Sequence, residues 1–243
     1  MIVSSRTYKQ KSLFGKEKNL IDPNNIYLSR ASSHRLPAEM IRDNPLALSG
    51  LLSKKVGGPR VKPYQPKGLW KEKNNFSLRL LEYKESKGED LYRRGMYTFI
   101  KRGSPPPSLI TFDATSREIC TIKREKTSSP LQSLVLLNDT QFFEASRVFA
   151  ERIISQSKND LSDQIIYGFR LATSRFPKES EVKLLKELYL NKLSFYKKNR
   201  GEAYKVISIG ASKTKFNKKA PQVAAMTMVA NTLLNLNESY YKY

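Results

Sequence analysis

The chain has 243 residues, and 39% of them are hydrophobic, which is enough to build a core, so we expect order over most of its length. It carries 44 Lys and Arg against 22 Asp and Glu, a net charge of +22 that raises the question of nucleic acid or another anionic partner. The basic excess is nearly uniform along the chain, and this pattern favours solvated lysines over a dedicated nucleic-acid-binding arm.

The counts of cysteine and histidine exclude several kinds of chemistry. With one Cys and one His the chain has no pair for a disulfide, no C-x-x-C-H haem attachment and no histidine-based metal site, so we expect neither a metal nor a cofactor in it. No stretch approaches the roughly 20 apolar residues of a transmembrane helix. The sequence also starts without the apolar run of a signal peptide, which would make a free-standing chain cytoplasmic.

Residues 1–128 are predicted to form a helix- and loop-rich half. Residues 35–53 space their apolar side chains as a helix does, and Pro45 predicts a kink or a break there because it cannot donate a backbone hydrogen bond. Residues 57–70 are rich in Gly and Pro, which predicts an extended surface connection.

Two further stretches in this half have weaker patterns. Residues 76–83 fit either a short strand or the start of a helix. Residues 88–102 predict a helix, with Arg93 and Arg94 largely outside its apolar face. We interpret Arg42, Asp43 and these two arginines as polar links between helices, with a binding site as the alternative.

Residues 129–243 are predicted to form a helical bundle half, because apolar residues recur there at three- and four-residue spacing. The expected helices begin at Pro130, after Asp139, after Asp160, at Glu179 and at Pro221. The fold class is therefore mainly α: an irregular helical domain whose long Pro- and Gly-rich connections lead into a C-terminal bundle of about five helices. We expect both halves to form one structural domain within a larger parent architecture.

One segment between the last two predicted helices, residues 192–219, is locally enriched in basic residues: it holds nine Lys and Arg against Glu202 alone. Tyr196, Tyr204 and Phe216 lie among these cations, so aromatic rings could stack bases while lysines meet phosphates. The candidate binding residues are Lys197, Lys198, Arg200, Lys213, Lys215, Lys218 and Lys219. The segment has few apolar anchors, and we favour a mobile, solvated loop over a polyanion site.

The stretch around the single cysteine offers candidate catalytic groups. Asp113 and Glu118 are carboxylates that could converge for glycoside hydrolysis, Cys120 is a thiol, and Arg117 could hold an anion or lower a pKa. The structural alternative is that Asp113 caps a turn, that the Arg117 and Glu118 charges pair with neighbouring helices, and that Cys120 is a small buried hydrophobe. We favour this alternative.

Long segments in a fixed order run through nearly the whole chain: RLPAEMIRD, GGPRVKPYQPKGLW, GEDLYRR, PPPSLITFDATSREIC, PLQSLVLLND and FFEASRVFAERI. Together they resemble the C-terminal domain of unknown function of planctomycete-type cytochrome c domain proteins. The resemblance implies a bacterial, exported parent protein with a c-type haem domain and a further domain upstream, and no settled activity. The opening IVSSRTYKQKS resembles the end of a helix inside that domain, so we expect an N-terminally truncated fragment.

The sequence departs from this family at Pro45 and at Ser128-Ser129, where relatives usually have Asn-Thr. We favour a noncatalytic helical scaffold or docking module, whose partners are the upstream haem and other domains, in cis or as a separate chain. Its location would then be periplasmic or at the cell surface. Two alternatives stay open: a hydrolase or carbohydrate-acting domain using the carboxylate cluster, and a polyanion or nucleic-acid binder using residues 192–219.

Overall fold

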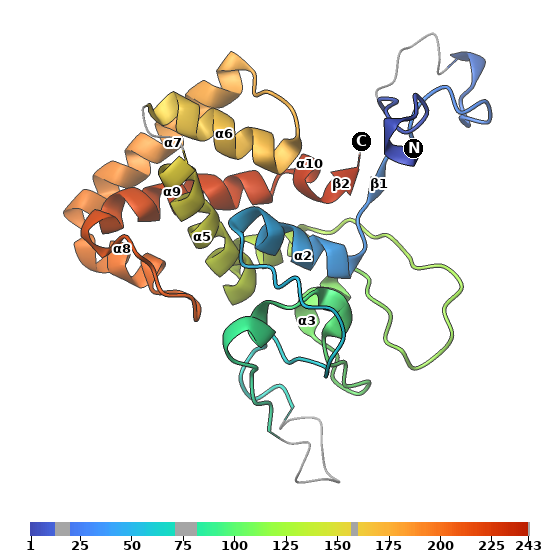
Figure 1. The fold of residues 1–243 in the computed structure, drawn as a ribbon, viewed down its shortest axis with the longest axis horizontal. Coiled ribbons are helices and arrows are strands. Elements are labelled where there is room, and N and C mark those ends of the chain that lie inside the picture. Colours follow the sequence, from blue (N-terminus) through green and yellow to red (C-terminus); the bar gives the residue numbers. More distant parts are fainter. Residues whose placement is uncertain (13–19, 71–81, 157–159, 243) are drawn as a thin grey trace.

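The computed structural model describes residues 1–12, 20–70, 82–156 and 160–242 (Figure 1). The first half contains η1 (Ile2–Ser4), β1 (His34–Arg35), α2 (Ala38–Ser49), η3 (Gly88–Tyr92), η4 (Gly95–Tyr97) and α3 (Pro107–Thr111). The second half contains α4 (Pro130–Asn138), α5 (Thr140–Gln156), α6 (Leu161–Thr173), α7 (Glu179–Lys198), α8 (Arg200–Ile207), η5 (Asn217–Lys219), α9 (Ala220–Leu234), α10 (Asn237–Tyr240) and β2 (Tyr241–Lys242). The prediction of a mainly α fold is confirmed.

Helix α9 is the centre of the second half, with α5, α7 and α8 packed around it (Figure 1). Its small residues Ala224, Ala225 and Ala230 are fully buried, so neighbouring helices can approach closely. The main apolar cluster joins α5, α6, α7 and α9, with Phe149 and Leu233 among its fully buried members. The predicted helices of residues 129–243 are thus confirmed.

The two halves are connected by α2, which packs on α5, and by the antiparallel pairing of β1 with β2. Arg35 lies opposite Tyr241 in this pairing. A second apolar cluster gathers Ile41 of α2, Phe112 after α3, Phe142 of α5 and Tyr240 of α10. Residues 34–35 and the end of the described chain therefore meet beside the same core.

Pro45 does not break the helix that contains it, since α2 runs from Ala38 to Ser49. The side chain of Leu46 is fully buried, and Asn44 Nδ2 donates to the carbonyl of Ser239 at 2.7 Å. Packing and this tether hold the helical backbone on both sides of the proline, which outweighs the hydrogen bond that Pro45 cannot make.

The predicted helix over residues 88–102 is wrong in form, because the stretch folds as the two short 3-10 turns η3 and η4. Backbone groups of this stretch form hydrogen bonds with a residue outside it. Val61 N donates to the Tyr97 carbonyl at 2.9 Å, and Phe99 N donates to the Val61 carbonyl at 2.8 Å. Gly95 lies against α2 so closely that a Cβ there would be 3.0 Å from the Glu39 backbone. Residues 76–81 of the ambiguous 76–83 stretch lie outside the described residues.

The basic segment is mostly helical, so the expectation of a loop is wrong. It includes the last turns of α7, all of α8 and η5. Tyr196, Ala203 and Ile207 are buried in a cluster with α9, so apolar anchors recur at helical spacing on one side of the lysines.

Candidate functional site

Asp113 closes the base of the loop between α3 and α4. Its carboxylate accepts hydrogen bonds from Arg35 Nη2 at 2.5 Å and from Thr127 N at 2.8 Å and Thr127 Oγ1 at 2.9 Å. Arg35 also donates to the carbonyl of Thr127 at 2.5 Å. Burial opposes ionisation, but these hydrogen bonds outweigh it and hold the pKa of Asp113 below its ordinary value. The residue is an ionised anchor for both ends of the loop.

The other candidates of this stretch lie apart from that anchor. Arg117, Glu118 and Cys120 are exposed on the loop, which makes a wide excursion between α3 and α4 (Figure 1). Within the described chain, neither Arg117 nor Glu118 forms an ion pair; Arg124 instead pairs with Glu39 at 2.7 Å. Contacts of Asp113 with Thr127 and of Arg124 with Glu39 fix the loop near its two ends. The middle of the loop therefore packs against no core.

The expectation of a buried Cys120 is therefore wrong. Its neighbours Ile119 and Ile122 are 78% and 106% exposed, so the apolar pair does not build the core expected around the thiol. Asp113 is enclosed by Arg35 and Thr127, whereas Glu118 faces solvent. The structure thus does not combine these groups into an acid–base or nucleophilic site.

Arg42 and Asp43 connect α2 to the turns that follow residue 88. Buried Arg42 donates to Gln141 Oε1 at 2.8 Å and to the carbonyl of Arg93 at 2.6 Å, and Asp43 accepts the Gly95 N–H at 2.7 Å. Burial lowers the pKa of Arg42 and raises that of Asp43, while the attraction between the two charges opposes both shifts. Both side chains fix the position of the chain around η4.

Arg93 is fully buried, contrary to its expected place outside an apolar face. Its guanidinium lies 3.9 Å from the centre of the Tyr97 ring and donates to the carbonyls of Lys55, Gly57 and Pro59. One side chain thereby holds the glycine-rich connection, which has few backbone hydrogen bonds of its own. Arg94, its neighbour, is exposed.

A fully buried Glu144 on α5 is the centre of a polar network that the sequence analysis missed. Its carboxylate accepts hydrogen bonds from Tyr92 OH at 2.8 Å, Tyr64 OH at 2.9 Å and Ser212 N at 2.6 Å. Arg147, one turn along α5, donates to the Ser212 carbonyl at 2.6 Å. The sequence signal for this network is a Glu and an Arg three residues apart, Glu144 and Arg147, which lie between the apolar positions of one helix.

The two tyrosines of this network are neutral donors. Burial, reinforced by the neighbouring Glu144 carboxylate, raises the pKa of Tyr64 and of Tyr92. Tyr64 also accepts the Ala211 N–H at 2.7 Å, so its oxygen is occupied on both sides. The network joins residues 64, 92 and 211–212 to α5 and leaves no free acid or base.

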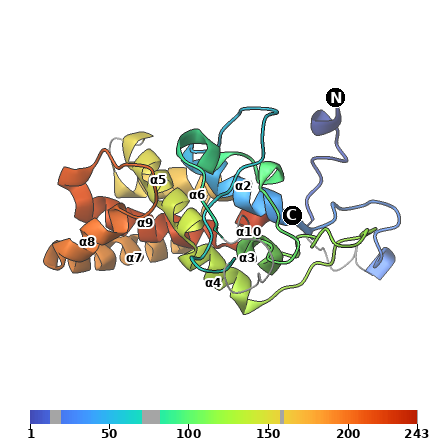
Figure 2. The same ribbon diagram turned by 90° about the horizontal axis from the view of Figure 1, so that it is seen from below.

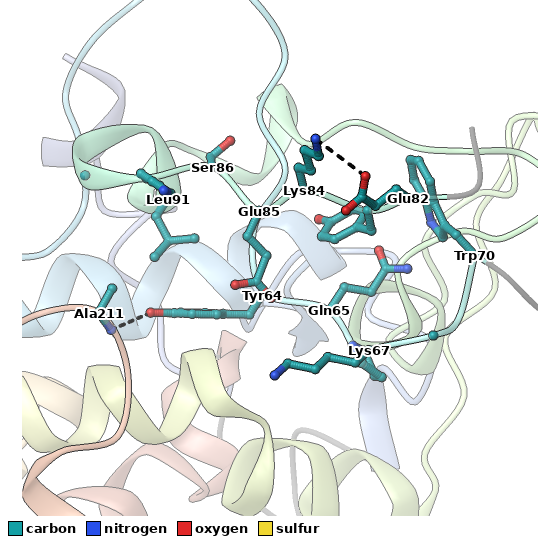
Figure 3. A pocket seen from close by; sticks show the side chains of 15 residues that line it. Tyr64, Gln65, Lys67, Trp70, Glu82, Lys84, Glu85, Ser86, Leu91 and Ala211 are labelled. Carbon is teal, nitrogen blue, oxygen red and sulfur yellow. Dashed lines mark hydrogen bonds and ion pairs between the residues drawn. The ribbon is translucent and has the colours of Figure 1, made fainter. Parts of the chain in front are cut away.

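Beside Tyr64 lies a cavity of about 860 Å³ (Figure 3). Residues of three segments line it, including Gln65, Trp70, Glu85 and Ala211. Figure 3 also shows the ion pair of Lys84 with Glu82 at its edge, 3.5 Å apart. In the described structure Gln65 Nε2 and Trp70 Nε1 are buried and have no hydrogen-bond partner. The space can hold a ligand, and two carboxylates, those of Glu82 and Glu85, are among its lining residues.

Comparison with known proteins identifies the family. The family model described as PSD1, protein of unknown function (DUF1553), matches residues 1–189. The chain belongs to the DUF1553 family. No curated protein and no solved structure matches it.

The DUF1553 match contains the Asp113 anchor, the arginine-held turns, Glu144 and the lining residues of the large cavity up to residue 91. It ends within α7, so the basic segment of this DUF1553 protein lies beyond the matched residues. Of the cations singled out there, Lys197, Arg200 and Lys218 line one small cavity. The other four, Lys198, Lys213, Lys215 and Lys219, are exposed elsewhere on the segment.

Neither a metal-ligand cluster nor a membrane-spanning helix is found among the residues that the structure describes. They contain no group of three or more His, Cys, Asp or Glu side chains arranged to hold a metal ion. Among the same residues, no helix is both long and apolar enough to span a membrane.

Proposed function

We propose that this DUF1553 chain is a noncatalytic helical scaffold or docking module, and that its two halves act as one structural domain. Its partners are the c-type haem and other upstream domains of an exported parent, in cis or as a separate chain, in the periplasm or at the cell surface. One observation carries the proposal: an N-terminal arm, defined as residues 1–12 and 20–31, presents apolar side chains to solvent. The strongly exposed ones are Ile2, Val3, Leu20, Ile21, Ile26, Tyr27 and Leu28.

The second part of the arm has an internally bonded shape. Asp22 accepts the N–H groups of Ile26 at 2.7 Å and Tyr27 at 2.9 Å, and Arg30 donates to the carbonyls of Asp22 and Pro23 at 2.8 Å. The polar atoms thus face inward, while the Ile26 and Tyr27 side chains are 73% and 79% exposed. A preformed apolar surface of this kind supports docking, because little ordering entropy is lost on binding.

The use of the polar groups elsewhere supports a noncatalytic role. The hydrogen bonds of four polar residues go to the chain's own backbone or side chains: Asp113, Arg42, Arg93 and Glu144. A catalytic acid, base or nucleophile needs a group within reach of a substrate atom. The arrangement favours a rigid frame that presents a surface.

The test is a binding titration between the chain and a c-type haem domain encoded in the same gene or beside it. At a haem-domain concentration 100 times the dissociation constant, binding stabilises the chain by about 2.7 kcal/mol. The melting temperature should then rise by roughly 5–10 °C for a chain of this size. The haem absorption reports the complex during size-exclusion chromatography.

Matched variants distinguish docking by the N-terminal arm from nonspecific hydrophobic binding. Ile26→Asp combined with Tyr27→Asp should weaken the complex at least about tenfold, since each buried apolar side chain contributes on the order of 1.5–3 kcal/mol. Ile119→Asp combined with Ile122→Asp changes an equally exposed apolar pair on the α3–α4 loop and should leave binding within about twofold. A stable, monodisperse chain that does not bind the haem domain would contradict the proposal.

A further inference from the structure

Four elements meet at the end of the molecule that lies opposite the N-terminal arm (Figure 2). Helix α7 ends at Lys198, Asn199 turns the chain, and α8 begins at Arg200. The short turn η5 leads directly into α9 beside them. We propose that a tetrahedral oxyanion of the phosphate type, free or as the phosphate ester of a larger molecule, binds where these four elements meet.

Basic side chains gather at this end of the molecule without acidic side chains beside them. Lys197, Arg200 and Lys218 come from α7, α8 and η5, and they line one cavity that no Asp or Glu side chain lines. None of the three forms an ion pair in the described chain. The nearest acid in the sequence, Glu202, is held by Lys205 at 2.7 Å. Within the part of the chain that the structure describes, the three cations therefore have no ion-pair partner.

The size and the remaining lining suit a small anion. The cavity has a volume of about 280 Å³, and Tyr204 and Gln222 add a hydroxyl and an amide to its wall. Arg200 offers a planar fork of N–H donors that matches phosphate oxygens in pairs, and the two lysines offer compact charges. An adjoining cavity of about 640 Å³ shares Tyr204 and is lined by Lys205 and Lys213 among others, which leaves room for the rest of an ester.

The scaffold beneath the cations is rigid. Tyr196, Ala203 and Ile207 anchor the ends of α7 and α8 in a buried cluster with α9. Helix α8 has no side-chain hydrogen bond capping its N-terminus, so its first-turn N–H groups add positive potential to that of the cations. The site is thus preorganised, and an anion would bind without reordering the helices.

The experiment is calorimetric titration of inorganic phosphate into the full chain in low-salt buffer. The triple variant Lys197→Gln, Arg200→Gln, Lys218→Gln should lose at least about tenfold in affinity. The control triple variant Lys123→Gln, Lys126→Gln, Lys183→Gln removes the same charge from exposed positions elsewhere and should stay within about twofold. A charge-conserving triple, Lys197→Arg, Arg200→Lys, Lys218→Arg, should keep saturable binding.

Two oligothymidines, one with a 5′-phosphate and one with a 5′-hydroxyl, identify the source of the anion. Binding of the 5′-phosphorylated oligothymidine that is tighter than that of both the 5′-hydroxyl one and inorganic phosphate assigns the site to an ester. Equal binding of the two oligothymidines, with saturable binding of inorganic phosphate, assigns the site to the free anion; both results support the site. The proposal is overturned if phosphate binding is not saturable, or if the cavity triple and the control triple lose affinity equally.

Discussion

The loop-rich half, residues 1–128, and the helical half, residues 129–242, are stabilised by different interactions. In the loop-rich half, buried guanidinium groups hold backbone carbonyls: Arg35 those of Phe112 and Thr127, Arg42 those of Leu91 and Arg93. In the helical half, a continuous apolar cluster around α9 holds the helices together. In this sequence, a buried charged residue is therefore more informative about loop structure than about chemistry.

The largest expected effect is in the helical half. Phe149→Ala empties the centre of the main cluster and should lower the free energy of unfolding by about 3–5 kcal/mol. Chemical denaturation measures the loss. Phe176→Ala is the control, because that ring is 67% exposed and its removal should cost less than about 0.5 kcal/mol.

Where the two halves meet at Glu144, Gly210→Ala should cost about 3 kcal/mol. A Cβ at position 210 would lie 2.1 Å from the Glu144 carboxyl carbon, and the backbone there has φ of +90°. Gly201→Ala is the matched control, since a Cβ on this helical glycine meets no atom within 4 Å and should stabilise α8 by about 0.5–1 kcal/mol. Equal thermal unfolding of the two variants would contradict the role of Gly210.

In the loop-rich half, Arg93→Met should cost about 2–3 kcal/mol, because the carbonyls of Lys55, Gly57 and Pro59 lose a charged donor. Arg94→Met, at the exposed neighbouring position, should change stability by less than about 0.5 kcal/mol. Urea denaturation measures the unfolding free energy of the two variants. Equal losses would mean that removing a positive charge, and not removing the buried hydrogen bonds of Arg93, destabilises the fold.

The smallest expected effect is on the pH dependence. Because the folded-state pKa of Asp113 is depressed, its contribution is present above the unfolded-state pKa of about 3.9 and is lost as pH falls through the folded-state pKa. The difference in unfolding free energy between the wild type and Asp113→Asn should be constant above about pH 5 and shrink below it. A difference independent of pH down to acid unfolding would show that the Arg35 contact does not depend on the charge.

The helices of residues 129–243 were predictable because apolar periodicity and capping residues act locally. The loop-rich half was not, because its backbone is fixed by contacts between residues far apart in sequence, such as Arg93 with Gly57 and Asp43 with Gly95. The same reason explains the error over residues 88–102: the spacing fits a helix, but the backbone donors bond across the chain to residue 61 instead.

Much less of the candidate site followed from sequence. Asp113 was singled out, but nothing in the local pattern predicts that Arg35 would neutralise it. Cys120 between two isoleucines resembles a core position and is exposed, because the loop is held near its base and not at its middle. Glu144 escaped attention since its partners Tyr64, Tyr92 and Ser212 are distant in sequence.

Buried arginines, in addition to apolar clusters, hold the connections of the loop-rich half. Amide hydrogen exchange of the wild type and of Arg93→Met is the direct test of this role. We expect exchange at Val61 and Phe99, whose N–H groups bridge the two loop segments, to accelerate by about 30-fold or more in the variant. Unchanged exchange at Val61 and Phe99 would contradict the role of Arg93 in holding these segments.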